Sequence, residues 1–226
     1  MLDKRKFYIN GQWVDPKTKK DFDVINPSTE ESFAVISLGT KADVDIAVKS
    51  AEFAFQTWKE TSKKDRLELI ENLLKIYKKR SSEMADAISK EMGAPMDWAK
   101  DVQTASGEAH IVDFIKRLKQ FNFEEQFDSK SNNYICYEPI GVCGLITPWN
   151  WPINQIALKV IPALATGCTM ILKPSEISPI SGMLFAEIID QTGFPPGVFN
   201  LVNGDGNGVG TQMSSHPDID MISFTG

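Results

Sequence analysis

The sequence has few of the residues that build disulfide frameworks or metal sites. Its 226 residues include three cysteines and two histidines. The amino-terminal segment MLDKRKFYING is charged and has no apolar run behind it, so it does not resemble a secretory signal. An odd cysteine count without such a signal predicts a reducing, cytoplasmic location and no disulfide framework. His110 and His216 lie far apart, and no Cys/His spacing predicts a metal site.

The chain also lacks a basic excess and a long apolar run. It has 24 Lys+Arg against 30 Asp+Glu, a net charge of −6, so we expect no nucleic-acid partner. The most apolar window, residues 156–172, is interrupted by Lys159, Pro162 and Gly167. A membrane-spanning helix needs about 20 consecutive apolar residues, so we expect no membrane partner either.

Residues 141–176 carry the strongest local signals. Residues 141–146 form an apolar run without helical period, which predicts a buried strand. Two prolines interrupt the chain at 147–152, and apolar residues then return at helical spacing from 153 to 165. Gly167 predicts the end of this helix, and residues 169–172 predict a second strand. This order is a βαβ unit, and ligands bind at the carboxyl ends of such strands.

The flanking segments extend the same pattern. Asn-Gly at 10–11 predicts a hairpin, which we expect to lie with residues 24–25 in a peripheral sheet. Amphipathic helices are predicted from residue 41, from about 63 to 92, and from about 96 to 118. Ser178-Pro179 predicts a helix cap and a first-turn proline. Strands are predicted at 198–202 and from 221, so the fold class is α/β, with a doubly wound parallel sheet and helices on both faces.

Several long motifs carry a resemblance. They are FYINGQWV (7–14), INPSTEE (25–31), TPWNWP (147–152), KPSE (173–176), GFPPGVFNLVNG (193–204) and SFTG (223–226). In this order they resemble the aldehyde dehydrogenase superfamily. The resemblance implies a Rossmann-like coenzyme-binding domain formed by residues 1–120 and 140–226, and a protruding β arm at 121–139 that serves oligomerisation. The alternative for the arm is a surface hairpin within the domain.

The family's chains are longer than this one. By the resemblance, the catalytic domain is absent, because the family's nucleophilic cysteine and general-base glutamate fall beyond Gly226. We therefore expect a truncated, partial sequence without aldehyde dehydrogenase activity of its own. The complete protein is expected to be a homo-oligomer that oxidises a small-molecule aldehyde to a carboxylic acid with NAD, or with NADP as the alternative.

Two catalytic contributions are expected within the chain. Asn150 lies in a proline-bounded loop past a strand end, where its amide can donate to a developing oxyanion. An isolated asparagine would more often bond its own backbone, but the flanking motif favours the functional interpretation. Lys159 lies on an apolar helix face. It either extends its ammonium to the surface or has the supporting charge-relay role that some family members give the matching lysine.

Lys173 and Glu176 follow the second strand of the βαβ unit, where an ammonium and a carboxylate can bond the hydroxyls of an adenosine ribose. The carboxylate would repel a 2′-phosphate and so favours NAD. The full set of expected coenzyme contacts is Ile146, Thr147, Pro148, Trp149, Asn150, Lys173, Ser175, Glu176, Gly206, Gly210, Phe224, Thr225 and Gly226. The glycines at 204, 206, 208 and 210 depart from the G-x-G-x-x-G fingerprint.

The cysteines are interpreted as structural, because apolar burial raises a thiol's pKa and makes it inert. Cys143 and Cys168 lie in apolar runs and Cys136 in the expected arm. A short-chain reductase is rejected, since no tyrosine is followed four places on by lysine. A non-catalytic dinucleotide-binding or interaction module and a fragment of a CoA-acylating relative remain as alternatives, although Trp149 favours the hydrolytic branch.

Overall fold

The computed structural model describes residues 1–128 and 132–226. At its centre is a six-stranded sheet in the order β11-β8-β9-β10-β2-β3. The strands are β2 (Phe7–Ile9), β3 (Gln12–Val14), β8 (Val142–Ile146), β9 (Thr169–Lys173), β10 (Phe199–Leu201) and β11 (Met221–Phe224). The four later strands run parallel, and every residue of β8 and β9 is buried, which explains their continuous apolar runs.

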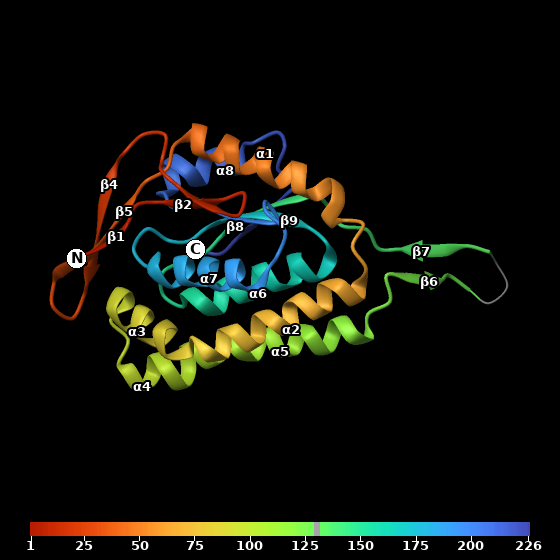
Figure 1. Cartoon of the computed structure of the whole chain (residues 1–226), viewed down its shortest axis with the longest axis horizontal. Coiled ribbons are helices and arrows are strands. Elements are labelled where there is room, and N and C mark those ends of the chain that lie inside the picture. The colour runs from red at the N-terminus through yellow and green to blue at the C-terminus, as the bar shows by residue number, and fades with distance from the viewer. Residues whose placement is uncertain (129–131) are drawn as a thin grey trace.

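Helices cover both faces of this sheet, as predicted (Figure 1). On one face lie α1 (Lys41–Trp58) and the short α8 (Thr211–Ser214), and on the other lie α6 (Pro152–Thr166) and α7 (Ile180–Thr192). A further layer of α2 (Lys63–Lys79), α3 (Ser81–Met92) and α5 (Ala105–Gln120) packs against α6 and α7. The apolar stripes that predicted the helices therefore face the core, and the doubly wound fold class is confirmed.

The amino-terminal hairpin lies elsewhere than expected. Asn10 and Gly11 both adopt positive φ, as the predicted turn requires, but β2 pairs antiparallel with β10 and so extends the central sheet. The three residues of β2 are at most 4% exposed, so burial draws this strand of the hairpin into the core. A separate three-stranded sheet is formed by β1 (Leu2–Lys4), β4 (Asp21–Asn26) and β5 (Glu31–Ser37). The prediction of one peripheral sheet was therefore wrong for the hairpin.

Helix boundaries also differ in places. The predicted helix from 63 to 92 is two helices, α2 and α3, that meet at Arg80. The third predicted helix contains α4 (Met96–Trp98), a π-helical turn η1 (Ala99–Thr104) and α5. A second π-helical turn, η2 (Gly206–Gly210), occupies the glycine-rich segment. Hydrophobic period alone does not distinguish these turns from a continuous helix.

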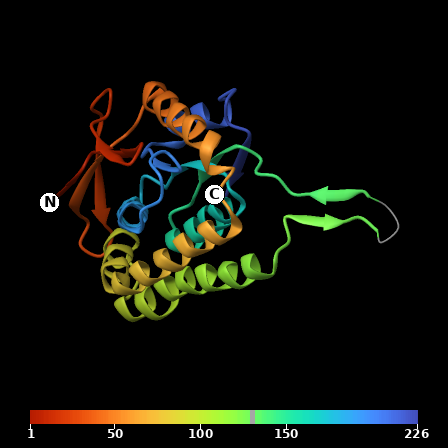
Figure 2. The same cartoon turned by 45° about the vertical axis from the view of Figure 1, so that its right-hand side comes forward.

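A hairpin projects from the body of the molecule (Figures 1 and 2). It consists of β6 (Glu124–Gln126) and β7 (Tyr134–Cys136), which pair antiparallel; residues 129–131 of the predicted arm lie outside the described residues. Its side chains include exposed Phe127 and Tyr134. The expected role of 121–139 in oligomerisation stays a prediction. In the described ranges, no helix is long and apolar enough to cross a membrane, and no cluster of side chains could hold a metal ion.

Candidate functional site

The sheet register brings three strand ends into one row. Ile146 at the end of β8 pairs with Lys173 of β9 on one side and with Phe224 of β11 on the other. After β8 the chain proceeds through β9 to β10, and then returns to place β11 on the opposite side of β8. The strand order thus reverses between β8 and β11. In open α/β sheets this is the point where ligands bind.

An open groove of about 340 Å³ lies at these strand ends. It is lined by Ile146, Thr147, Pro148, Trp149, Asn150, Lys173, Ser175, Glu176, Gly206, Phe224, Thr225 and Gly226. Every predicted coenzyme contact except Gly210 therefore lines one groove. Gly210 is buried behind it, where a Cβ would lie 3.8 Å from the Lys173 Cε atom.

Lys173 is the most buried charged group of the groove, at 3% exposure. Its ammonium donates to the carbonyl oxygens of Gly204 at 2.6 Å and Pro174 at 3.0 Å, and to the Glu176 carboxylate at 3.3 Å. Burial lowers the pKa of Lys173, and the Glu176 carboxylate partly opposes that shift. The two side chains form a fixed pair whose remaining carboxylate oxygen can accept from a ligand hydroxyl.

The Asn150 loop is held from both sides. The buried Ser178 hydroxyl donates to the Trp149 carbonyl oxygen at 3.2 Å, and the Trp151 indole N–H donates to the Ser106 hydroxyl at 3.1 Å. Proline at the first position of α6 then fixes the exit of the loop. The Asn150 side chain is exposed, lines the groove and makes no hydrogen bond to any described residue. Its amide is available to a ligand.

Lys159 does not line the groove. Its ammonium donates to the Ser223 hydroxyl of β11 at 2.8 Å, and burial lowers its pKa. The side chain therefore ties α6 to the strand at the switch point. The sequence left two interpretations of Lys159. An ammonium extended freely to the surface does not agree with the bond to Ser223, and the charge-relay role stays a prediction.

Two residues near the groove have roles that the sequence did not predict. Ser178 was expected to cap α7, but the buried carboxylate of Glu91 caps it instead. Glu91 accepts from the N–H groups of Ile180 at 2.5 Å and Ser181 at 3.1 Å. Burial raises the pKa of Glu91 to about 7. The available signal was its place on the apolar stripe of α3, three residues after Ile88.

The three cysteines do not behave alike. Cys143 and Cys168 are buried, and the hydrogen bond between them, followed by burial, raises the pKa of Cys143. The same hydrogen bond lowers the pKa of Cys168, although burial was expected to raise it. Cys136 is exposed on β7. The expectation that burial raises the thiol pKa is therefore wrong for Cys168, and it does not apply to Cys136, which is exposed.

Comparison with known proteins identifies the family. The model of the aldehyde dehydrogenase family matches residues 13–226. The chain belongs to this family. It is 53% identical to the 3-succinoylsemialdehyde-pyridine dehydrogenase of a Pseudomonas species, over 100% of this chain and 47% of that protein. The chain thus spans about half the length of the curated relatives it matches.

Solved structures agree with this assignment. An aldehyde dehydrogenase from Bartonella henselae superposes with a TM-score of 0.98 at 60% identity, over 99% of this chain and 47% of that chain. A variant of aldehyde dehydrogenase C from Pseudomonas syringae, in complex with NAD+ and octanal, has a TM-score of 0.94 at 47% identity, over 96% of this chain and 44% of its own. These matches confirm both the resemblance seen in the motifs and the Rossmann-like fold.

Proposed function

We propose that this chain is the coenzyme-binding portion of an NAD(P)-dependent aldehyde dehydrogenase, which oxidises an aldehyde to a carboxylic acid. The observation that carries the proposal is the groove at the switch point, where Asn150, Lys173 and Glu176 meet. Two relatives support the proposal: the Pseudomonas syringae enzyme and a betaine aldehyde dehydrogenase from Staphylococcus aureus were both solved in complex with NAD+.

The residues of the groove fit a dinucleotide. The Glu176 carboxylate, which the Lys173 ammonium holds in place, offers an oxygen at one end that can accept from a hydroxyl of an adenosine ribose. NAD+ is the preferred coenzyme because the Glu176 carboxylate would repel the 2′-phosphate of NADP+. Bound NAD+ would supply a hydride acceptor to the reaction.

Asn150 would contribute to the chemistry of the complete enzyme. Its amide N–H donates to the oxygen that becomes negative when the aldehyde carbon is attacked. A fixed donor of this kind typically contributes about 3 kcal/mol to the lowering of a barrier. The loop is pre-organised for this by Ser178 and Ser106, so the donor needs little reorientation during reaction. Lys159 supports the site indirectly through Ser223.

Two expectations drawn from the family belong to the same proposal. The 226 residues alone do not turn over aldehyde, because the family's nucleophile and general base match no residue of this sequence. The projecting β6–β7 hairpin makes subunit contacts in the complete, cytoplasmic homo-oligomer, for which its exposed Phe127 and Tyr134 are suitable. Aldehyde turnover by the purified chain would contradict the first expectation.

The test is calorimetric binding of NAD+ to the 226-residue chain, with Lys173→Ala and Glu176→Ala beside it. Loss of a charge-assisted hydrogen bond costs about 1.5–3 kcal/mol, so each variant should bind roughly tenfold more weakly or worse. Lys41→Ala, which removes an exposed ammonium paired with Asp45, is the matched control and should bind normally. Unchanged affinity in both groove variants would refute the ribose placement. A folded chain without NAD+ binding would instead favour a non-catalytic interaction module.

A further inference from the structure

Arg66 is a buried cation without a counter-charge. It lies on α2 and is 5% exposed. Within the described ranges no carboxylate lies within 4.0 Å of it, whereas Arg5, Arg80 and Arg117 each pair with at least one acid. Removing a charge from water costs several kcal/mol unless a partner compensates. Arg66 thus differs from the other arginines of the chain in both burial and pairing.

The partners that Arg66 does have are neutral. Its Nε–H donates to the Ala165 carbonyl oxygen at 3.0 Å, and Nη1 donates to the Thr61 carbonyl oxygen at 2.6 Å and hydroxyl at 3.3 Å. The guanidinium carbon lies 5.1 Å from the centre of the Phe123 ring. These contacts fix the orientation of the guanidinium plane and leave the two N–H donors of Nη2 without a bond to any described residue.

The side chain lines a cavity of about 370 Å³, whose lining also includes Phe123 and Tyr137 at the base of the β6–β7 hairpin. The other charged lining residues are Lys59, Glu60 and Glu138. Lys59 and Glu60 are a loose pair at 3.9 Å, and the Lys59 ammonium lies 5.7 Å from the centre of the Phe55 ring. Both glutamates are exposed. Lys59 is exposed as well, so Arg66 is the buried charge among these lining residues, and the acids of the cavity lie at its exposed side.

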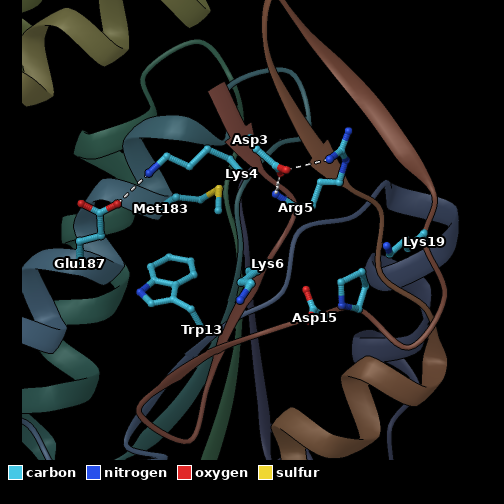
Figure 3. A pocket seen from close by; sticks show the side chains of 10 residues that line it. Asp3, Lys4, Arg5, Lys6, Trp13, Asp15, Lys19, Met183 and Glu187 are labelled. Atoms are coloured by element: carbon cyan, nitrogen blue, oxygen red, sulfur yellow. Dashed lines mark hydrogen bonds and ion pairs between the residues drawn. The ribbon is translucent and has the colours of Figure 1, made fainter. Parts of the chain in front are cut away.

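In a second cavity, carboxylates of the protein itself pair with the lysine and arginine side chains Lys4 and Arg5. This cavity, of about 340 Å³, lies between β1, the β2–β3 hairpin and α7 (Figure 3). There the Lys4 ammonium pairs with Glu187 at 2.8 Å, and Arg5 pairs with Asp3 at 2.8 Å. The protein itself neutralises these cations. Arg66 has no such arrangement.

We propose that the cavity beside Arg66 is a binding site for a small oxyanion, either a carboxylate or inorganic phosphate. The free Nη2 donors hold one oxygen, and Lys59 closes the cavity over the other side of the anion. Arginine suits this role because its planar fork matches the oxygens of a carboxylate or a phosphate. The site is separate from the coenzyme groove, and the proposal does not depend on the proposed function.

Two internal groups are the rivals of a bound anion. Burial lowers the pKa of Arg66, while Cys168 and Asp65 raise it. The Asp65 carboxylate is already engaged in the cap of α2, where it accepts from the Ser62 hydroxyl at 2.8 Å. Cys168 is the stronger rival, because as a thiolate it would supply the missing negative charge. The experiment must therefore distinguish a bound anion from a Cys168 thiolate.

The test uses the 226-residue chain labelled with ¹⁵N and follows the arginine Nε–H resonances by NMR. Sodium phosphate, and separately sodium acetate, is titrated against sodium chloride at matched ionic strength. We expect a saturable shift of the Arg66 resonance with phosphate or acetate, and a Tm that rises above that in chloride. The resonances of Arg80 and Arg117, which are paired, should not move. Saturating NAD+ should leave the Arg66 shift in place.

Variants make the result specific. Lys59→Gln leaves the structural hydrogen bonds of Arg66 intact and should weaken anion binding severalfold, whereas Lys20→Gln, which removes an exposed ammonium elsewhere, should not. Arg66→Lys keeps the charge and loses the fork, and should abolish the Tm increase given by phosphate. If no anion moves the Arg66 resonance more than chloride does, the proposal is wrong. If Cys168→Ser is needed before anions bind, the thiolate is the counter-charge and the proposal is likewise wrong.

Discussion

The Ser178 hydroxyl donates to the carbonyl oxygen of Trp149 across 3.2 Å, although 29 positions separate them. Ser178 belongs to the loop that carries Glu176, and Trp149 to the loop that carries Asn150. One partly buried hydrogen bond therefore joins the two sides of the groove. The donor is fully buried, so water cannot replace it without rearrangement.

Removing this bond should affect both stability and binding. Ser178→Ala leaves the Trp149 carbonyl oxygen without its donor, and we expect a loss of about 1–2 kcal/mol in the free energy of unfolding. Because the Asn150 loop is then less restrained, NAD+ affinity should fall severalfold. Ser89→Ala removes a similar serine–carbonyl bond, to Ala94 at 2.8 Å, between two residues that do not line the groove. In urea unfolding the two variants should lose similar stability, and only Ser178→Ala should weaken NAD+ binding in calorimetry.

The ends of α6 and α7 provide a matched pair of glycines. Gly167 and Gly193 both follow their helix in the left-handed conformation, with φ of 84° and 89°. A Cβ at Gly167 would lie 3.1 Å from Arg66 Nη1, whereas a Cβ at Gly193 meets nothing within 4 Å. Gly193→Ala should therefore cost only backbone strain, about 1–2 kcal/mol. Gly167→Ala should cost more in urea unfolding, because the added Cβ also crowds Arg66 and Pro139, whose Cγ would lie at 3.1 Å; equal costs would show that both neighbours yield freely.

Glu91 should give the stability of the chain a pH dependence. Its pKa is raised from 4.5 to about 7 in the folded state, so the folded chain holds a proton that the unfolded chain releases. The free energy of unfolding should be highest below the unfolded pKa and fall as pH rises through about 7, by at most roughly 3 kcal/mol. Glu91→Gln should flatten this fall. Urea unfolding at several pH values measures it, and Asp86→Asn, which removes an exposed carboxyl on the same helix, should keep the wild-type slope.

The sequence predicted the local elements and most of the groove for physical reasons. The buried strands β8 and β9 are continuous apolar runs, and parallel strands place their carboxyl ends at one edge of a sheet. Lys173 and Asn150 follow such ends directly, so their convergence could be inferred from order alone. Gly210 could not be excluded in the same way, because the π-helical turn that carries it behind Lys173 has no distinct sequence signal.

Contacts between distant elements were the part that could not be predicted. The burial that places β2 beside β10 depends on which sheet edge is free, and short strands do not encode that choice. Glu91 and Arg66 each lie on the apolar stripe of a helix, where a charged side chain is expected to be buried. The stripe does not indicate which group on another element the buried charge contacts. For Glu91 the partner is the start of α7. For Arg66 the partner that we propose is an anion bound in the cavity beside it.

Coenzyme preference gives the last prediction. The Glu176 carboxylate lies 3.3 Å from the Lys173 ammonium at the proposed ribose end of the groove. A 2′-phosphate bound there would approach that carboxylate, and like charges in a partly buried site repel by more than in water. Glu176→Gln removes the repulsion and leaves an amide that still accepts from Lys173. The ratio of NADP+ affinity to NAD+ affinity should therefore rise by about tenfold, equivalent to about 1.4 kcal/mol, in calorimetric titrations.

Glu60→Gln, which removes an exposed carboxylate elsewhere, should leave the ratio unchanged. If Glu176→Gln lowered the affinity for both coenzymes equally, the carboxylate would hold a hydroxyl common to both and would not select between them.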